Sequence, residues 1–272
     1  MNRSVAGIVT AHRQTKGAGF IVRRPLPTAG MPLVDPFLHV DEMGPIDCAP
    51  GETVGAPDHP QRGFETVSYL LEGEVHHEDS AGHAGVIRAG DVQWMTAGRG
   101  IINSETPTVT QLDEGARVHG FQLWVNLPAR GKMMAPRYQK VPSHALPTAR
   151  SADGLASMKV IAGDALGRRA VIDTRTPTHH LDSTLEAGAT VEQAIPERHN
   201  ALVYVFEGEA LVSGHAVTEG QLALLDEGDR VARRPAARRA GGRSRAVRHE
   251  RRGAAPRGHA QLPGGRFAEI QR

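Results

Sequence analysis

Two short segments carry polar side chains at a spacing that could build a metal site. His59 lies two residues before Gln61, and Asn103 lies two residues before Glu105. Residues two apart in a β-strand point to the same face, so both members of each pair can point inward. Two such pairs on neighbouring strands would bring four polar side chains together. Two of the four are amides, which are weaker ligands for a redox metal than imidazole or carboxylate.

The segments around these pairs are typical of β-strands. Short apolar runs at residues 66–71, 85–88, 92–95 and 118–125 are separated by turns rich in Gly, Asp and Pro, and helical periodicity is scarce. This pattern predicts an all-β sandwich or barrel. The strands would hold the polar pairs, and the glycine-rich turn at residues 97–100 would lead into the second pair.

The chain also repeats itself. Tyr69-Leu70-Leu71-Glu72-Gly73-Glu74 recurs as Tyr204-Val205-Phe206-Glu207-Gly208-Glu209, and the next turn, at residues 89–92, recurs at residues 219–222. Two matching strand-and-turn patterns in the same order predict two copies of one β-barrel unit. The positions in the second copy that match His59 and Gln61 are Ala194 and Pro196, so only the first copy has a metal pattern.

Composition limits the class of protein. The chain has 272 residues, 39% of them hydrophobic, and its apolar runs are too short to span a membrane. Residues 1–5 lack the apolar stretch of a secretory signal. The single cysteine, Cys48, excludes an intramolecular disulfide and suits a reducing compartment. We therefore expect a cytoplasmic protein with no membrane association.

The basic residues are concentrated near the end of the chain. Ten arginines and a single acid, Glu250, lie between residues 233 and 257, although the net charge of the whole chain is only +2. The segment has no strand or helix period. A basic arm for nucleic acid and a solvated tail are two interpretations. Its Arg, Ala, Gly and Pro bias favours a third, a GC-rich gene translated out of frame, so we expect no nucleic-acid function.

Three longer motifs together resemble one family. They are Asp35-Pro36-Phe37-Leu38-His39-Val40-Asp41-Glu42, the segment 59–67 that begins His59-Pro60-Gln61-Arg62-Gly63, and the segment 90–101 that ends Gly98-Arg99-Gly100-Ile101. They resemble pirins, two-barrel members of the cupin superfamily, and the resemblance covers roughly residues 3–230. It returns at Gly265-Arg266-Phe267-Ala268, as a pair of compensating frameshifts would allow.

The resemblance implies a fold and domain boundaries. The fold is two tandem cupin β-barrels, a bicupin of antiparallel double-stranded β-helices, with few helices. We expect an N-terminal barrel at residues 1–128 with the metal-site positions and a linker at residues 129–149. A C-terminal barrel without a metal motif would follow at residues 150–231, and the atypical Arg-rich tail would occupy residues 232–272.

The resemblance also implies a ligand set. Pirins hold one iron through three histidines and one glutamate, and the family positions fall on His59, Gln61, Asn103 and Glu105 in this chain. Two of the four ligands are therefore substituted. The cofactor implied is Fe(2+), and the substitutions leave three alternatives: iron held weakly, a harder divalent ion in its place, or no ion. Glu65 could help to hold an ion with His59 and Glu105, but the pirin pattern favours a contact of Glu65 with backbone or Arg62.

Two functions follow from the resemblance. Pirins are similar to quercetin 2,3-dioxygenases, which implies an iron-dependent dioxygenase with a flavonol-like substrate, a weakened metal site and Glu105 as the catalytic proton acceptor. The alternative is a non-catalytic regulatory module that binds a protein partner, a role that would survive loss of the metal. In both cases we expect a monomer. We also expect His77 at a surface strand end and His180 in a loop.

Overall fold

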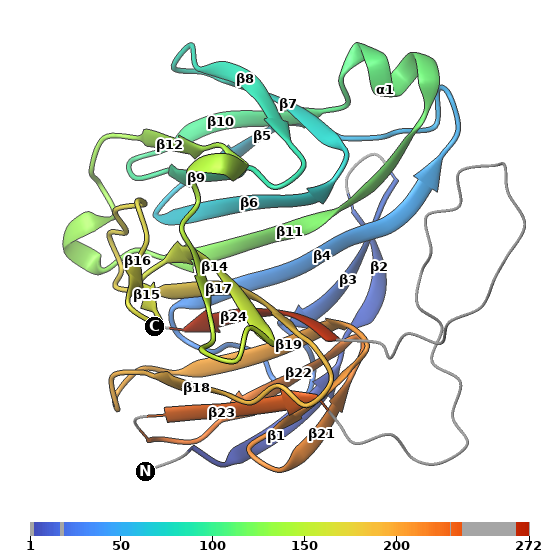
Figure 1. Ribbon diagram of the computed structural model, residues 1–272. Coiled ribbons are helices and arrows are strands. Elements are labelled where there is room, and N and C mark those ends of the chain that lie inside the picture. The colour runs from blue at the N-terminus through green and yellow to red at the C-terminus, as the bar shows by residue number, and fades with distance from the viewer. Residues whose placement is uncertain (1–2, 17–18, 229, 236–264, 272) are drawn as a thin grey trace, which may run out of the picture.

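The strands of this chain form two stacked β-barrels (Figure 1). The computed structural model describes residues 3–16, 19–228, 230–235 and 265–271. Within those ranges the helices are α1 (Val109–Glu114) and two short 3-10 helices, Ala129–Gly131 and Ser143–Ala145. The expected all-β fold of two barrels with few helices is confirmed.

The first barrel consists of a seven-stranded and a four-stranded antiparallel sheet. The larger sheet has the order β12-β9-β6-β11-β4-β3-β2, and the smaller has the order β5-β10-β7-β8. Their strands are β2 (His12–Lys16), β3 (Phe20–Leu26), β4 (Phe37–Cys48), β5 (Ala56–Gln61), β6 (Phe64–Glu72), β7 (Glu74–Asp79), β8 (Ala84–Arg88), β9 (Val92–Thr96), β10 (Ile101–Thr106), β11 (Ala116–Asn126) and β12 (Arg137–Val141).

The second barrel has the same plan. Its sheets have the orders β1-β22-β19-β24-β17-β14-β13 and β18-β23-β20-β21, and β15 pairs with β16 in a small ribbon. The strands are β1 (Val5–Thr10), β13 (Thr148–Arg150), β14 (Ala156–Ala162), β15 (Asp164–Ala165), β16 (Arg168–Arg169), β17 (His179–Leu185), β18 (Val191–Ala194), β19 (Ala201–Glu207), β20 (Glu209–Val212), β21 (His215–Thr218), β22 (Gln221–Leu225), β23 (Arg230–Pro235) and β24 (Gly265–Gln271).

The repeated turns occupy equivalent places in the two barrels. Gly73, between β6 and β7, has a φ of 83°, and Gly208, between β19 and β20, has a φ of 77°. A side chain at Gly73 would also bring its Cβ within 2.9 Å of the Arg117 carbonyl oxygen. Both turns therefore need glycine, which explains why the Glu-Gly-Glu pattern appears twice.

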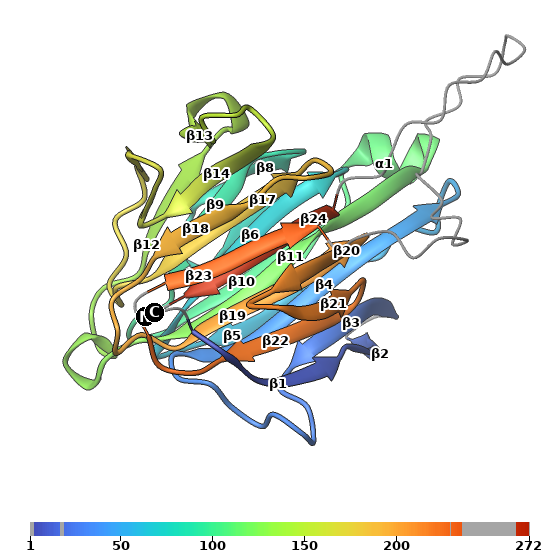
Figure 2. The same ribbon diagram turned by 60° about the horizontal axis from the view of Figure 1, so that its bottom comes forward.

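The two ends of the chain both contribute to the second barrel. β1 pairs with β22, so the first strand lies in the second barrel although the next strands, β2 to β4, belong to the first (Figure 2). β24 lies between β19 and β17, as β11 lies between β6 and β4 in the first barrel. The Arg-rich part of the expected tail, residues 236–264, lies outside the described residues, and the domain boundaries and the frameshift remain predictions.

An apolar layer joins the barrels, and β6 contributes to it because alternate residues of a strand point to opposite faces of the sheet. Val67 and Tyr69 face the second barrel and are fully buried, whereas Ser68 faces the interior of the first. The layer continues through Trp94 and Phe121 to Tyr204. His180 also lies near it, fully buried in β17 with its ring 6.3 Å from that of Tyr69, so the expectation of a loop there was wrong.

Candidate metal centre

β5 and β10 place the four residues singled out in the sequence on one face of the smaller sheet. The two strands are antiparallel, with Asn103 opposite His59 and Ile101 opposite Gln61. Residues directly opposite each other share a face, and Glu105 follows Asn103 after an irregularity in the register. β5 is an edge strand of this sheet. Proline has no backbone N–H to donate, and an edge strand tolerates Pro60 between the two polar residues because the strand has a neighbour on one side only.

His59 lines the cavity of the first barrel, and both of its ring nitrogens have hydrogen-bond partners. Its Nδ1 lies 2.8 Å from the Pro57 carbonyl oxygen. That oxygen can only accept, so Nδ1 carries the hydrogen and Nε2 is an acceptor. The Gln61 amide donates to His59 Nε2 at 3.0 Å. The substituted ligand thus occupies the nitrogen that would otherwise face an ion.

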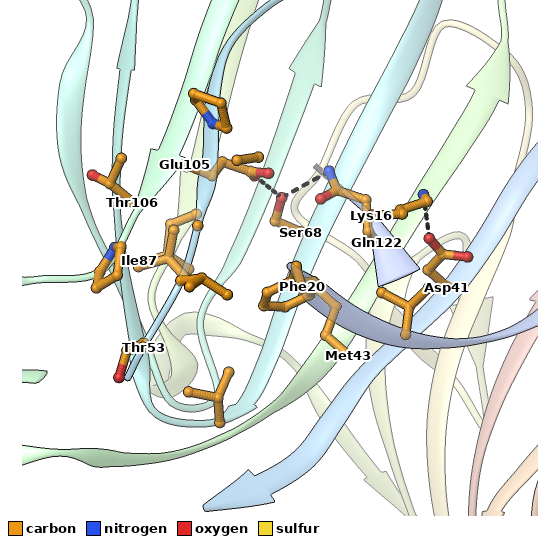
Figure 3. Close-up of a pocket in the computed structure, with 18 of the residues that line it drawn as sticks. Lys16, Phe20, Asp41, Met43, Thr53, Ser68, Ile87, Glu105, Thr106 and Gln122 are labelled. Carbon is orange, nitrogen blue, oxygen red and sulfur yellow. Dashed lines mark hydrogen bonds and ion pairs between the residues drawn. The ribbon is translucent and has the colours of Figure 1, made fainter. Parts of the chain in front are cut away.

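Glu105 is held by a hydrogen bond that crosses the barrel interior. Ser68 Oγ on β6 donates to Glu105 Oε1 at 2.7 Å, and Gln122 Nε2 on β11 donates to Ser68 Oγ at 3.3 Å (Figure 3). The sequence analysis did not single out Ser68 or Gln122. The sequence feature that could have identified them is a single polar residue between two apolar residues in a strand, as in Val67-Ser68-Tyr69 and Phe121-Gln122-Leu123.

Asn103 belongs to a neighbouring group of side chains. It is 2% exposed, and its Oδ1 accepts a hydrogen bond from Tyr138 Oη at 3.4 Å. Tyr138 stacks on His77, with ring centroids 5.6 Å apart. Burial would raise the pKa of Asp79, opposite Asn103, but hydrogen bonds from Tyr138 and His83 lower it. Asp79 and Asn103 thus compete for the single hydroxyl hydrogen of Tyr138. His77 is 5% exposed within β7, so the expectation of a strand end at the surface was wrong.

A cavity of about 380 Å³ opens beside these residues. His59, Gln61 and Glu105 line it, and Asn103 is not among its lining residues. The walls are otherwise largely apolar, and they include Phe20, Val22, Met43, Leu70, Ile87 and Trp124. Such a cavity, with a few convergent polar groups, is the usual form of a small-molecule site.

Glu65 does not join the group. Its side chain is fully buried, accepts a hydrogen bond from Thr96 Oγ1 at 2.7 Å, and accepts another from the Arg175 backbone N–H at 3.3 Å. It shares a face of β6 with Val67, which packs toward the second barrel. An ion held jointly by His59, Glu65 and Glu105 does not fit this arrangement.

The donor set does not fit firmly held iron. It offers one imidazole whose acceptor nitrogen is capped, one carboxylate bonded to Ser68, and two amides. Across the described part of the chain, no three His, Cys, Asp or Glu side chains are grouped so that they could hold a metal ion. The buried Gln61 Oε1 has no hydrogen-bond partner among these residues, but a single neutral oxygen does not replace two imidazoles.

Comparison with known proteins identifies the family. The Pirin model matches residues 19–125, and the Pirin C-terminal cupin domain model matches residues 180–240. A pirin-like protein of Solanum lycopersicum is 45% identical over 207 residues, which make up 76% of this chain and 67% of that protein. The chain belongs to the pirin family.

Solved structures agree with this assignment. A quercetin 2,3-dioxygenase from Acinetobacter baumannii is 27% identical to this pirin with a TM-score of 0.81, covering 100% of this chain and 87% of its own. A bacterial pirin of Escherichia coli in complex with nickel(II) has a TM-score of 0.68 at 15% identity, covering 97% and 98%. The second likeness concerns the fold alone. No helix in the described residues is long and apolar enough to cross a membrane.

Proposed function

We propose that this pirin binds a flavonol-like molecule in the cavity of its first barrel and turns it over poorly, because its metal positions do not retain iron. The observation that carries the proposal is the pairing of Gln61 with His59 Nε2 at the edge of a largely apolar cavity. The cavity supports binding, and the capped imidazole argues against a firmly held ion. The Acinetobacter structure named a quercetin 2,3-dioxygenase supports the choice of ligand class.

The residues have separate roles in this proposal. The apolar walls would hold the aromatic rings of the ligand. Glu105, the only carboxylate among the four positions, would accept a proton from a ligand hydroxyl, and its bond from Ser68 would keep the carboxylate turned toward the cavity. A dioxygenase reaction would need a metal, and we assign no step of it to this donor set.

The test compares the natural protein with the double variant Gln61→His and Asn103→His. Quercetin binding is followed by its absorbance change, turnover by its consumption with added Fe²⁺, and metal content by elemental analysis. We expect the natural protein to bind quercetin with little turnover, and the double variant to retain iron and gain turnover. Absence of quercetin binding by the natural protein would overturn the proposal, as would one equivalent of iron in it.

A non-catalytic regulatory role is the second candidate. It is favoured by the internal pairing of the candidate metal positions, because the contacts of Gln61 with His59 and of Asn103 with Tyr138 need no ion. A protein partner whose affinity is unchanged by chelator and by saturating quercetin would support this role. Loss of that affinity on chelation would count against it.

A further inference from the structure

A row of polar side chains crosses the inner face of the larger sheet. Ser68 on β6 lies opposite Gln122 on β11, and Gln122 lies opposite Asp41 on β4. All three line the cavity. Glu105 is joined to one end through Ser68, and Lys16 is joined to the other through Asp41 (Figure 3). The neighbouring positions Leu70 and Met43 are apolar, so the row is a distinct polar path across an apolar chamber.

The Lys16 end of the row has an excess of positive charge. Arg24 binds both oxygens of Asp41, with Nε 2.7 Å from Oδ1 and Nη2 2.9 Å from Oδ2. Lys16 contacts the same carboxylate, and so does His39 Nε2 at 2.6 Å. The Asp41 carboxylate is therefore the shared ion-pair partner of two cations, Arg24 and Lys16. Lys16 Nζ also lies 2.7 Å from His39 Nε2, and the Glu105 carboxylate acts on it through the cavity. Asp41 is nevertheless the single carboxylate that Lys16 contacts within the described residues.

Burial at this end disfavours the charged form of both Asp41 and Lys16. It would raise the pKa of Asp41, but hydrogen bonds from Arg24 and His39 hold that pKa well below its ordinary value. Burial lowers the pKa of Lys16 despite the contact with Asp41. The carboxylate is thus stabilised in its charged form, while the ammonium of Lys16 is under-compensated. A ligand oxyanion beside Lys16 would supply the missing charge.

Buried polar atoms elsewhere on the cavity wall also lack partners. Gln61 Oε1, Thr53 Oγ1 and Gln111 Nε2 have no hydrogen-bond partner among the described residues. Their side chains are 3%, 8% and 4% exposed and line the cavity. Buried polar groups in proteins are normally paired, because leaving them unpaired costs free energy. They lie apart from Lys16 in the chain and indicate independently that the chamber receives a ligand with polar groups on an apolar body.

We propose that Lys16 is the specificity-determining residue of this cavity and that the preferred ligands are aromatic oxyanions, such as aryl carboxylates and ionised phenols. The oxyanion binds the Lys16 ammonium, the rings lie against Phe20, Met43 and Ile87, and hydroxyl groups reach the polar row. This inference rests on the proposed small-molecule function and assigns the ligand chemistry within it.

The test uses a matched pair of probes, 2-naphthoate and the neutral 2-naphthamide, with quercetin as the reference ligand. Dissociation constants are measured by calorimetry for the natural protein, Lys16→Met and Lys16→Arg. Loss of a hydrogen bond to a charged group should weaken naphthoate binding by roughly tenfold to a hundredfold in Lys16→Met. Naphthamide binding should change by less than about threefold, and Lys16→Arg should restore much of the naphthoate affinity.

Arg13→Met is the matched control, because Arg13 lies on the same strand but is exposed and three residues away, on the other face. It removes the same charge and should leave naphthoate binding unchanged. If the natural protein binds naphthoate and naphthamide with equal affinity, the Lys16 inference is overturned, and no measurement on a variant is needed. If quercetin still binds in that case, the proposed function stands; if no probe binds, both fail.

Discussion

Arg23→Met should destabilise the protein strongly, because it leaves a buried carboxylate short of a partner. Glu42 is fully buried, and its Oε1 lies 2.5 Å from Arg23 Nη2. Tyr204 Oη, from the second barrel, donates to Glu42 Oε2 at 2.5 Å, and His119 Nε2 lies 3.0 Å from Oε1. Arg23 is the single permanent cation that the described residues place on this carboxylate.

The magnitude follows from the burial of the pair. Removing one partner of a buried ion pair costs about 3–5 kcal/mol, because the remaining charge is no longer compensated. The Arg23 side chain is 21% exposed, so solvent reduces the loss, and we expect about 3 kcal/mol. For a chain of this size that corresponds to a fall in Tm of roughly 6 °C or more.

Urea unfolding followed by fluorescence and circular dichroism measures the loss, and calorimetry measures Tm. Arg23→Met with Glu42→Gln removes the charge as well as its partner, so the double variant should be more stable than Arg23→Met alone. Arg13→Met, at an exposed site, should change stability by less than about 0.5 kcal/mol. A loss below about 1 kcal/mol for Arg23→Met, or no gain in the double variant, would refute the reasoning.

Three further predictions test other parts of the structure. Burial lowers the pKa of His180 to about 3, so folding favours its neutral form. The free energy of unfolding should therefore fall by about 1.4 kcal/mol per pH unit between pH 6 and 4. Urea midpoints measured across that range should show this fall, and His180→Leu should flatten it. Gly98→Ala should lower Tm, because Gly98 has a φ of 52° and a Cβ there would lie 2.2 Å from the Met134 carbonyl oxygen; a Tm equal to that of the natural protein would contradict this. Chelator should leave the Tm of the natural protein unchanged but lower that of iron-loaded Gln61→His with Asn103→His, since only the latter would gain stability from an ion.

Periodicity and turn chemistry predicted the fold because they are local properties. The Glu-Gly-Glu turns at Gly73 and Gly208 require positive φ whatever surrounds them, and alternating strands fix which face is buried. The pairing of β1 with β22 was not predictable in this way, since it depends on a contact between residues more than two hundred positions apart. His180 was assigned to a loop because its neighbour Pro177 suggested a turn, whereas tertiary packing extends a buried strand through it.

Spacing and resemblance predicted the four candidate metal positions but not the side chains that contact them, and a metal site there remains a prediction. Spacing two apart placed His59 with Gln61 on β5 and Asn103 with Glu105 on β10, and the resemblance supplied the pairing of these strands. The larger sheet supplies Ser68 and Tyr138, which contact Glu105 and Asn103, and Lys16 at the other end of the polar row. No local pattern relates these three residues to the four positions. Which side chains meet across a barrel interior depends on strand order and register, which a single sequence does not state.

The first barrel can keep its shape without an ion because each candidate metal position has a side-chain partner within the protein, although the buried Gln61 Oε1 has none. Gln61 pairs with His59, Tyr138 with Asn103, and Ser68 with Glu105, so no carboxylate or imidazole among them is left to repel a neighbour in an empty site. An intact site of three histidines and one glutamate would lack such partners without its metal. The amide substitutions therefore separate folding from metal binding. They leave the cavity and its polar row available to a ligand, so we expect ligand binding that does not depend on an ion.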